Sequence, residues 1–262
     1  MPEPALSDPA GTDSAGTGSS RPRFSVVVPA YNEERYLPRL LDSIDAARAS
    51  YGRPESIEIV VADNASTDAT ASLAAARGCR VARVEKRVIA AARNGGARAA
   101  RGEILCFVDA DARIHPETFA AIDRSLATGR VVGGATGLRI ERLSAGIAAA
   151  YLMIVPMIWL TNIDSGLVFC RREDFESVGG YDESLRIAED VAFPWALKRL
   201  GRRRGQKLVR LRRYKAIASL RKFDEHGDWH YVMMLPRSLL LFAFGRRRFE
   251  DWIDSYWYRP NR

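Results

Sequence analysis

The chain has 262 residues, of which 47% are hydrophobic, so it can bury the core of one large domain. Its formal net charge of +8 is compatible with nucleic acid, an anionic membrane surface or a phosphate-bearing substrate as partner. The three cysteines, Cys79, Cys106 and Cys170, show no CxxC or other metal-site spacing, which excludes a disulfide framework and indicates buried thiols of a reduced compartment.

The beginning of the chain is rich in Pro, Gly, Ser, Thr and Ala and has almost nothing to bury. We therefore expect residues 1–22 to form a disordered tail. Residues 1–10 contain neither a basic n-region nor an apolar h-region, so we expect no signal peptide.

Strand-like and helix-like patterns alternate from residue 24 to residue 127. Short apolar runs predict four buried strands, at 24–28 (ended by Pro29), 57–62, 80–84 and 103–108. Helical spacing of apolar or small residues predicts a helix that begins at 32–34 and further helices at 68–77, 93–100 and 116–127. This rhythm is typical of βαβ units and predicts an α/β fold with a mostly parallel sheet.

Polar clusters follow three of these strands, at 31–33, 63–64 and 109–111. Because ligands of open α/β sheets bind at the carboxyl ends of the strands, we expect these clusters to share one site. Alternation along an extended chain would point Asp109 and Asp111 to the same side, where their oxygens could hold a divalent cation. Taken alone, the same pair could also be a turn residue and a helix cap.

The second half of the sequence is less regular. We predict strands at 130–137 and 165–171, a turn at 179–182, and a helix at 191–200 that ends at Gly201 as its C′ glycine. A dense basic run, 202–213, comes next.

Two apolar segments, 147–160 and 231–244, are shorter than the ~20 residues that cross a bilayer. We expect buried core helices, with an interfacial face as the alternative for the second segment. Cationic residues 246–248 and the aromatic residues Trp252 and 256–258 follow it, which would suit a headgroup layer.

The order of four motifs resembles that of family 2 glycosyltransferases, which are GT-A fold enzymes that use nucleotide sugars. The resemblance covers roughly residues 24–205, includes two further segments at 92–96 and 178–183, and rests on the motifs at 26–34, 62–68, 109–111 and 189–190. The segment 219–229 is similar to the small non-processive bacterial members.

The resemblance implies roles for individual residues. The residues that would bind the nucleotide sugar are Pro29, Ala30, Tyr31, Glu33, Asp63, Arg93, Asp109 and Ala110. Asp109 and Asp111 would hold Mg²⁺ or Mn²⁺ against the diphosphate, and Asp190 would be the general base of an inverting single displacement. Acceptor-side candidates are Glu189 and Gly180. Arg221 could bind the diphosphate or could belong to a solvated basic run. His226 and His230 are candidates for a third metal ligand, with lone surface histidines as the alternative.

Two positions depart from the family pattern. Asn64 stands where many relatives carry a second aspartate, which leaves the choice of base open. Arg113 stands where the lipid-phosphate mannosyltransferases carry a metal-binding glutamine, and an arginine cannot coordinate a cation.

The resemblance also gives an expected organisation. Residues 23–220 would form the GT-A domain, with a nucleotide half at 23–113 and an acceptor half at 114–220, and residues 221–262 a C-terminal amphipathic and basic segment. The donor would be linked to UDP, GDP or dTDP, and the hydroxyl acceptor would be lipid-linked or a saccharide. We expect a cytoplasmic protein, or one in peripheral contact with the inner face of the membrane.

Two other functions compete with this interpretation. A sugar-phosphate nucleotidyltransferase would need a Gly-rich phosphate loop after the first strand, where this chain has the acidic stretch 29–34. A non-enzymatic basic protein would bind membrane or nucleic acid. We expect no nucleic-acid partner, because the basic run lacks interleaved aromatic residues and no recognition-helix motif is present.

Overall fold

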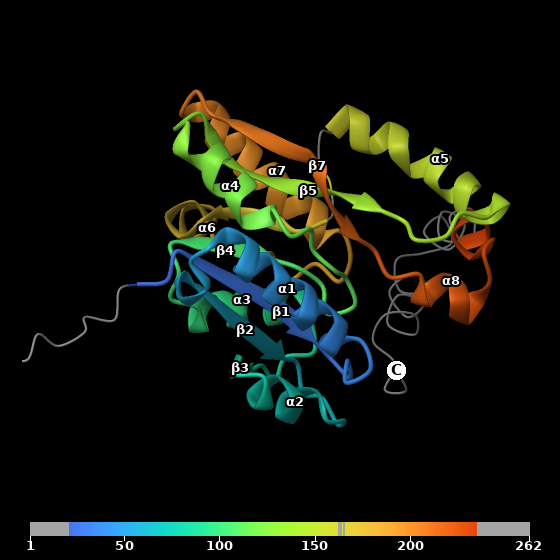
Figure 1. Ribbon diagram of the computed structural model, residues 1–262. Helices are drawn as coiled ribbons and strands as arrows, with labels where there is room; N and C mark the ends of the chain where they lie inside the picture. Colours follow the sequence, from blue (N-terminus) through green and yellow to red (C-terminus); the bar gives the residue numbers. More distant parts are fainter. Residues whose placement is uncertain (1–20, 162–163, 165, 235–262) are drawn as a thin grey trace, which may run out of the picture.

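A computed structural model describes residues 21–161, 164 and 166–234 of the chain (Figure 1). Its centre is a seven-stranded sheet in the order β3-β2-β1-β4-β6-β5-β7. The strands are β1 (Phe24–Ala30), β2 (Ile57–Asp63), β3 (Arg80–Arg83), β4 (Ile104–Phe107), β5 (Val131–Arg139), β6 (Val168–Arg171) and β7 (Lys207–Ile217). Only β6 runs antiparallel to its neighbours. The predicted mostly parallel sheet is therefore confirmed.

Helices cover both faces of the sheet (Figure 1). They are α1 (Leu37–Tyr51), α2 (Thr70–Ala76), α3 (Ile89–Ala99), α4 (Thr118–Ala127), α5 (Ala145–Thr161), α6 (Arg172–Val178), α7 (Glu189–Arg203) and α8 (Arg221–His226), and a short 3₁₀ helix, η1 (Pro54–Ser56), precedes β2. No helix among the described residues is both long and apolar enough to cross a membrane.

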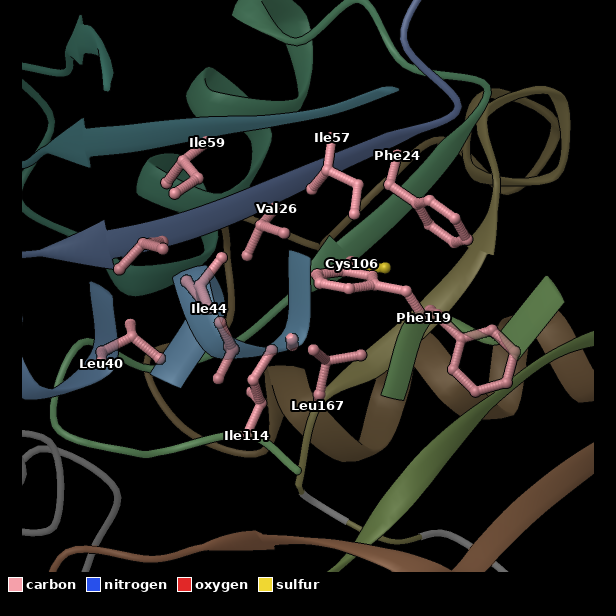
Figure 2. Close-up of a cluster of buried hydrophobic side chains, with 14 of the residues drawn as sticks. Phe24, Val26, Leu40, Ile44, Ile57, Ile59, Cys106, Ile114, Phe119 and Leu167 are labelled. Carbon is pink, nitrogen blue, oxygen red and sulfur yellow. The ribbon is translucent and has the colours of Figure 1, made fainter. Parts of the chain in front are cut away.

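The core consists of two clusters, one on each face of the sheet. Figure 2 shows the first, in which Val26 of β1 packs with Ile44 of α1 and Phe119 of α4. The second cluster holds Val27 of β1 with residues of α3, α6 and α7. Neighbouring residues of one strand thus serve opposite faces, as the pleat requires. The three cysteines are buried and free, as predicted.

Strand β1 continues through Pro29, where we had expected it to end. Pro29 pairs with Ala62 of β2, but β1 pairs with β4 only as far as Val27. The carbonyl of Val27 accepts from Val108 on the β4 side, so Pro29, two residues on, faces the same side. Because β4 has already ended there, the missing N–H of proline costs no ladder hydrogen bond.

Helix α1 begins at Leu37, later than the predicted start at 32–34. Asn32 adopts a left-handed φ of 53°, and its N–H donates to Ser66 Oγ at 3.1 Å. The N–H of Glu33 donates to Thr70 Oγ1 at 2.7 Å. These bonds hold the segment against the start of α2, so the helix begins only after them.

Helix α7 runs past Gly201 to Arg203, so the prediction of Gly201 as a C′ glycine is wrong. A Cβ at Gly201 would lie 2.7 Å from Val132 Cγ1, so glycine allows close packing of α7 on β5. Gly205, with φ of 67°, follows the end of the helix instead.

The basic run 202–213 ends helix α7 and then enters β7, a strand that we did not predict. Leu208, Leu211 and Ala216 of β7 are buried, and Arg212 and Arg213 are exposed. Strand β7 is an edge strand, and exposed cations are a common way to protect such an edge from pairing with another chain.

The apolar segment 147–160 is helical, as α5, but it is not the buried core helix that we expected. Ile147 and Ala150 are buried, yet 76% of Leu152 and 46% of Met153 are exposed. The second apolar segment is described only to residue 234, and its remainder lies outside the described residues, as do the tail 1–20 and the aromatic and basic residues of 246–258.

Candidate active site

A cavity of ≈ 360 Å³ opens at the carboxyl edge of the sheet, beside the ends of β1, β2 and β4. It is also lined by α3, by the segment that leads into α7 and by α8. The expected site residues that line it are Pro29, Ala30, Tyr31, Glu33, Arg93, Asp109, Ala110, Asp111, Glu189, Asp190 and Arg221. Side chains from both halves of the sequence therefore meet in one place.

Asp109 and Asp111 follow the end of β4 in a turn, where the N–H of Ala112 donates to the carbonyl of Asp109 at 3.1 Å. We had expected an extended chain that points both carboxylates to the same side. The chain is instead a turn at this point, and both carboxylates still line the cavity. Burial raises the pKa of Asp111 and the Asp109 charge adds to this, while Arg221 opposes it.

Arg93 of α3 connects two sides of the cavity, the turn after β4 and the start of α7. Its guanidinium donates to Asp109 at 2.9 Å and to Glu189 at 2.8 Å, and only 10% of its side chain is exposed. Burial alone would lower the pKa of Arg93, but Asp109, Glu189 and other nearby groups outweigh it and raise that pKa. The arginine therefore stays charged and holds together the segments of Asp109 and Glu189, which are 80 residues apart in the sequence.

Arg221, at the start of α8, closes another side of the cavity. It donates to both carboxylate oxygens of Glu33 at 3.0 and 2.9 Å, and lies 3.6 Å from Asp111. Its Nε is buried and has no hydrogen-bond partner among the described residues. Burial raises the pKa of Glu33 to about 7, and Arg221 opposes that shift.

Asp190 lies in the first turn of α7 and lines the cavity. Burial raises its pKa, Arg93 lowers it, and the nearby Asp109 raises it further. A carboxylate whose pKa is raised accepts a proton more readily, which suits a general base. The residue before Glu189, Ala188, has a left-handed φ of 63° that turns the chain into α7.

Asn94 holds the segment before α7 in place. Its Nδ2 donates to the carbonyl of Tyr181 at 2.8 Å and to Glu183 at 3.0 Å, and its Oδ1 accepts from the N–H of Tyr181 at 2.9 Å. The motif 92–96 thus provides two residues that line the cavity, Ala92 and Arg93, and one, Asn94, that positions the opposite wall.

Three expected site residues do not line the cavity. Asp63 is buried and accepts from the N–H of Ser66 at 3.1 Å, and the next residue, Asn64, lines the cavity in its place. Gly180 lies behind the wall, where a Cβ would come 2.7 Å from Asn94 Oδ1. His226 packs on His230 at a ring distance of 4.5 Å.

Several cavity residues were not expected from the sequence. They are Asn64, Ile89, Ala92, Arg186, Ile187, Ala188, Ser219, Lys222, Phe223 and Tyr231. Asn64 was noted only as a departure from the family. Arg186, Ile187, Ala188 and Ser219 lie outside regular helices and strands, where periodicity gives no signal. The others lie on α3, on α8 and in the helical segment after α8, and the sequence does not show which side of these helices faces the cavity.

The two carboxylates of Asp109 and Asp111 are the metal ligands that we expected at this site. Among the described residues, no group of three His, Cys, Asp or Glu side chains could hold an ion. Arg113 instead forms an ion pair with Glu141 and does not line the cavity. The side chains of Asp109 and Asp111 are 58% and 23% exposed, so both can reach a ligand.

Several known proteins are similar to this chain in sequence or in fold. Residues 25–141 match the family model for glycosyl transferase family 2. The chain is 29% identical to a validoxylamine A glucosyltransferase of Streptomyces hygroscopicus subsp. limoneus, over 65% of this chain and 46% of that protein. It is 39% identical to an undecaprenyl-phosphate 4-deoxy-4-formamido-L-arabinose transferase of Pseudomonas paraeruginosa, over 42% of this chain and 34% of that protein. The chain therefore spans less than half the length of these two relatives.

Among solved structures, a mannosyltransferase of Pyrobaculum calidifontis in complex with GDP-Man and Mn²⁺ has a TM-score of 0.61. It is 27% identical, and the match covers 76% of this chain and 57% of that one. The sheet and its flanking helices are the GT-A fold of such enzymes. Residues 25–141, which run from β1 to the end of β5, thus match glycosyl transferase family 2 in sequence.

Proposed function

We propose that the protein is an inverting glycosyltransferase that moves a sugar from a nucleoside-diphosphate sugar to a hydroxyl acceptor. The observation that carries this proposal is the convergence of Asp109, Asp111 and Asp190 on one cavity of ≈ 360 Å³. The relatives named above are glycosyltransferases, which favours this activity over a sugar-phosphate nucleotidyltransferase and over a non-enzymatic basic protein.

The residues present fit a divalent cation. Mg²⁺ is commonly held by one or two carboxylates, with substrate phosphates and water as the other ligands. Asp109 and Asp111 supply two such carboxylates, and a third protein ligand is not required. When bound, Mg²⁺ or Mn²⁺ would stabilise the negative charge of the diphosphate leaving group as a Lewis acid. Arg221, with its unpartnered Nε, would contribute positive charge on the same side.

We assign the general base to Asp190. A sugar hydroxyl is a poor nucleophile, and a positioned carboxylate can take its proton as the new bond forms. Glu189 is already paired with the buried Arg93, which leaves Asp190 as the better-suited of the two neighbours. A single base opposite the leaving group implies one displacement, with inversion at the anomeric carbon.

We assign contact with the nucleotide base to Asn64. Its Nδ2 donates to the carbonyls of Val84 and Lys86 at 2.9 and 2.8 Å, which fixes the amide. Its Oδ1 accepts no hydrogen bond from a described residue and can take one from an N–H of the base. Uracil, thymine and guanine all carry such an N–H, consistent with UDP, dTDP or GDP as carrier.

The remaining assignments are also proposals. We place the donor half at 23–113 and the acceptor half at 114–220, with 221–262 as a C-terminal segment. The acceptor is a saccharide or a lipid-linked hydroxyl compound. The relative named for undecaprenyl phosphate favours a lipid-linked acceptor and a place at the inner face of the membrane.

The test is a thermal-shift screen against UDP, GDP, dTDP and CDP, each with and without Mn²⁺. A ligand that binds only the native state stabilises it by about 2.7 kcal/mol at a hundredfold excess over Kd. We expect one nucleotide to raise the Tm in a Mn²⁺-dependent way, and Asp111→Asn to remove that dependence. If no nucleotide shifts the melting of the wild-type chain, the proposed donor site is wrong.

A further inference from the structure

The large apolar side chains that are exposed among the described residues come from only two stretches. Leu143, Leu152 and Met153 belong to α5 and the loop before it, and Trp229 and Met233 follow α8. Their exposed fractions are 74%, 76%, 46%, 53% and 73% in that order. Figure 1 shows α5 at the outside of the molecule, on the same side as α8. Such a concentration of exposed apolar side chains marks an interaction site.

Specific contacts hold the two stretches together. A Cβ at Gly146 would lie 2.5 Å from the carbonyl oxygen of Asp228, so the start of α5 packs directly on the backbone after α8. Arg142 pairs with Asp224 and with Asp228, both at 2.9 Å. The five exposed apolar side chains therefore belong to two segments that pack on each other, and we call the surface that they form the α5–α8 surface.

A second cavity, of ≈ 210 Å³, lies beside this surface. Its apolar wall includes Tyr151 and Val155, one helical turn apart on α5, and its polar wall comes from β7. At the polar wall, Arg210 is paired with the buried Asp164 at 2.8 Å, so these two charges balance.

The other two cations of the cavity, Arg212 and Lys215, are exposed. The lining therefore contains three cationic side chains and one carboxylate, that of Asp164. No described residue forms a hydrogen bond or ion pair with the Lys215 ammonium. The second cavity therefore has cationic side chains, a volume of ≈ 210 Å³ and an apolar helix, α5, beside it.

We propose that the α5–α8 surface docks on an anionic membrane, with a phospholipid headgroup phosphate in the second cavity and acyl chains against Leu152 and Met153. Guanidinium and ammonium groups bind phosphate oxygens well. Cations of β7 next to the apolar side chains of α5 suit the boundary between headgroups and acyl chains. A nucleic acid or an acidic protein would use the cations but not the neighbouring apolar face.

Docking there would place one wall of the first cavity near the membrane, and it would not involve Asp109, Asp111 or Asp190. Phe223 and Tyr231, whose rings lie 5.0 Å apart, line the first cavity and flank Trp229 in sequence. Membrane contact through Trp229 and Met233 would bring this wall to the lipid surface, where a lipid-linked acceptor could enter. Vesicle binding and sugar transfer can therefore fail separately.

The experiment is flotation of the purified full chain with phosphatidylglycerol-containing vesicles and with pure phosphatidylcholine vesicles. The cavity variant is Arg212→Gln/Lys215→Gln, and the matched control is Arg202→Gln/Arg203→Gln, which removes two exposed charges at the end of α7. Each cation near an anionic surface strengthens binding about fivefold. We expect the cavity variant to lose about twentyfold in partition to anionic vesicles, and the control to change less than threefold.

A second variant tests the apolar part. Leu152→Ser/Met153→Ser replaces exposed side chains, so it should fold, and it should weaken vesicle binding at least fivefold. Equal losses in the cavity variant and its control would overturn the proposal, since general charge would then explain binding. Full displacement by 10 mM inorganic phosphate would assign the cavity to a free anion instead. Competition by an RNA oligonucleotide that depends on Arg212 and Lys215 would assign it to nucleic acid. A retained Mn²⁺-dependent nucleotide shift in each variant would show that its fold is intact.

Discussion

Arg221 donates to both carboxylate oxygens of Glu33, at 3.0 and 2.9 Å, although the two residues are 188 positions apart. The side chains are only 14% and 12% exposed. This contact attaches α8 to the loop after β1. A chain that lost it would keep its sheet but lose one wall of the cavity.

Glu33 gives the stability of the fold a pH dependence. Burial raises its pKa from 4.5 to about 7, so its contribution is fully present below pH 4.5 and is lost as the pH rises through about 7. In metal-free buffer, we expect the wild-type free energy of unfolding, relative to that of Glu33→Gln, to fall by roughly 3 kcal/mol from pH 4.5 to pH 8. Urea unfolding at the two pH values measures this. If the difference in the free energy of unfolding between the wild type and Glu33→Gln does not change with pH, the pKa of Glu33 is not raised.

Replacing the proposed base should separate binding from chemistry. We expect Asp190→Asn to keep the nucleotide-induced thermal shift and to lower the transfer rate by about 10²- to 10⁴-fold, because the hydroxyl then has no proton acceptor. The exposed Asp182→Asn, in the same segment, is the matched control and should keep the wild-type rate. An Asp190→Asn variant as active as the control would rule out the base assignment.

Asn94 should matter for both stability and activity. Asn94→Ala leaves the buried N–H and carbonyl of Tyr181 without their partner, which we expect to cost about 3 kcal/mol in the free energy of unfolding. Sugar transfer should also slow, because the segment leading to Asp190 loses its anchor. Arg98→Ala, an exposed position on the same helix, serves as the control. The positioning role would be refuted by a folded Asn94→Ala chain with wild-type kinetics and stability.

The packing of α3 on β1 depends on Gly96. A Cβ there would lie 2.4 Å from Val27 Cγ1 and 3.2 Å from Ala62 Cβ. We expect Gly96→Ala to destabilise the fold by about 1–3 kcal/mol. Val27→Ala removes the clashing methyl group, so the double variant should be more stable than the sum of the two single effects. Chemical denaturation of the four chains tests this, and strict additivity would mean that the clash is relieved elsewhere.

The sequence predicts the first half of the fold well, because its strands are short apolar runs that end in polar clusters. Tyr31, Glu33, Asp109, Ala110 and Asp111 line the cavity for this reason, and the other six expected residues that line it were implied by the family resemblance. One expected residue, Asp63 at the end of β2, does not line the cavity. Successive side chains of a strand point to opposite sides, so Asp63 accepts from the N–H of Ser66 and Asn64 lines the cavity. The sequence pattern at 63–64 does not show which of the two side chains is already used by the backbone.

The second half is harder to predict because burial there does not follow composition. Strand β7 carries so many cations that its buried Leu208 and Leu211 are hidden in a basic run. Helix α5 is apolar throughout 147–160, yet it exposes Leu152 and Met153. Apolar composition predicts that a surface will be covered, but it does not say whether the protein itself or a partner covers it.

The antiparallel strand β6 lies between β4 and β5 and marks where the chain leaves the sheet and returns to it. The excursion from residue 140 to residue 167 carries α5 and begins and ends at strands that stay side by side. Such an insertion can lengthen, shorten or be exchanged without changing the order of β1 and β4, the strands that precede Glu33, Asp109 and Asp111. The architecture thus lets the exposed apolar surface of α5 change separately from the side chains that line the first cavity.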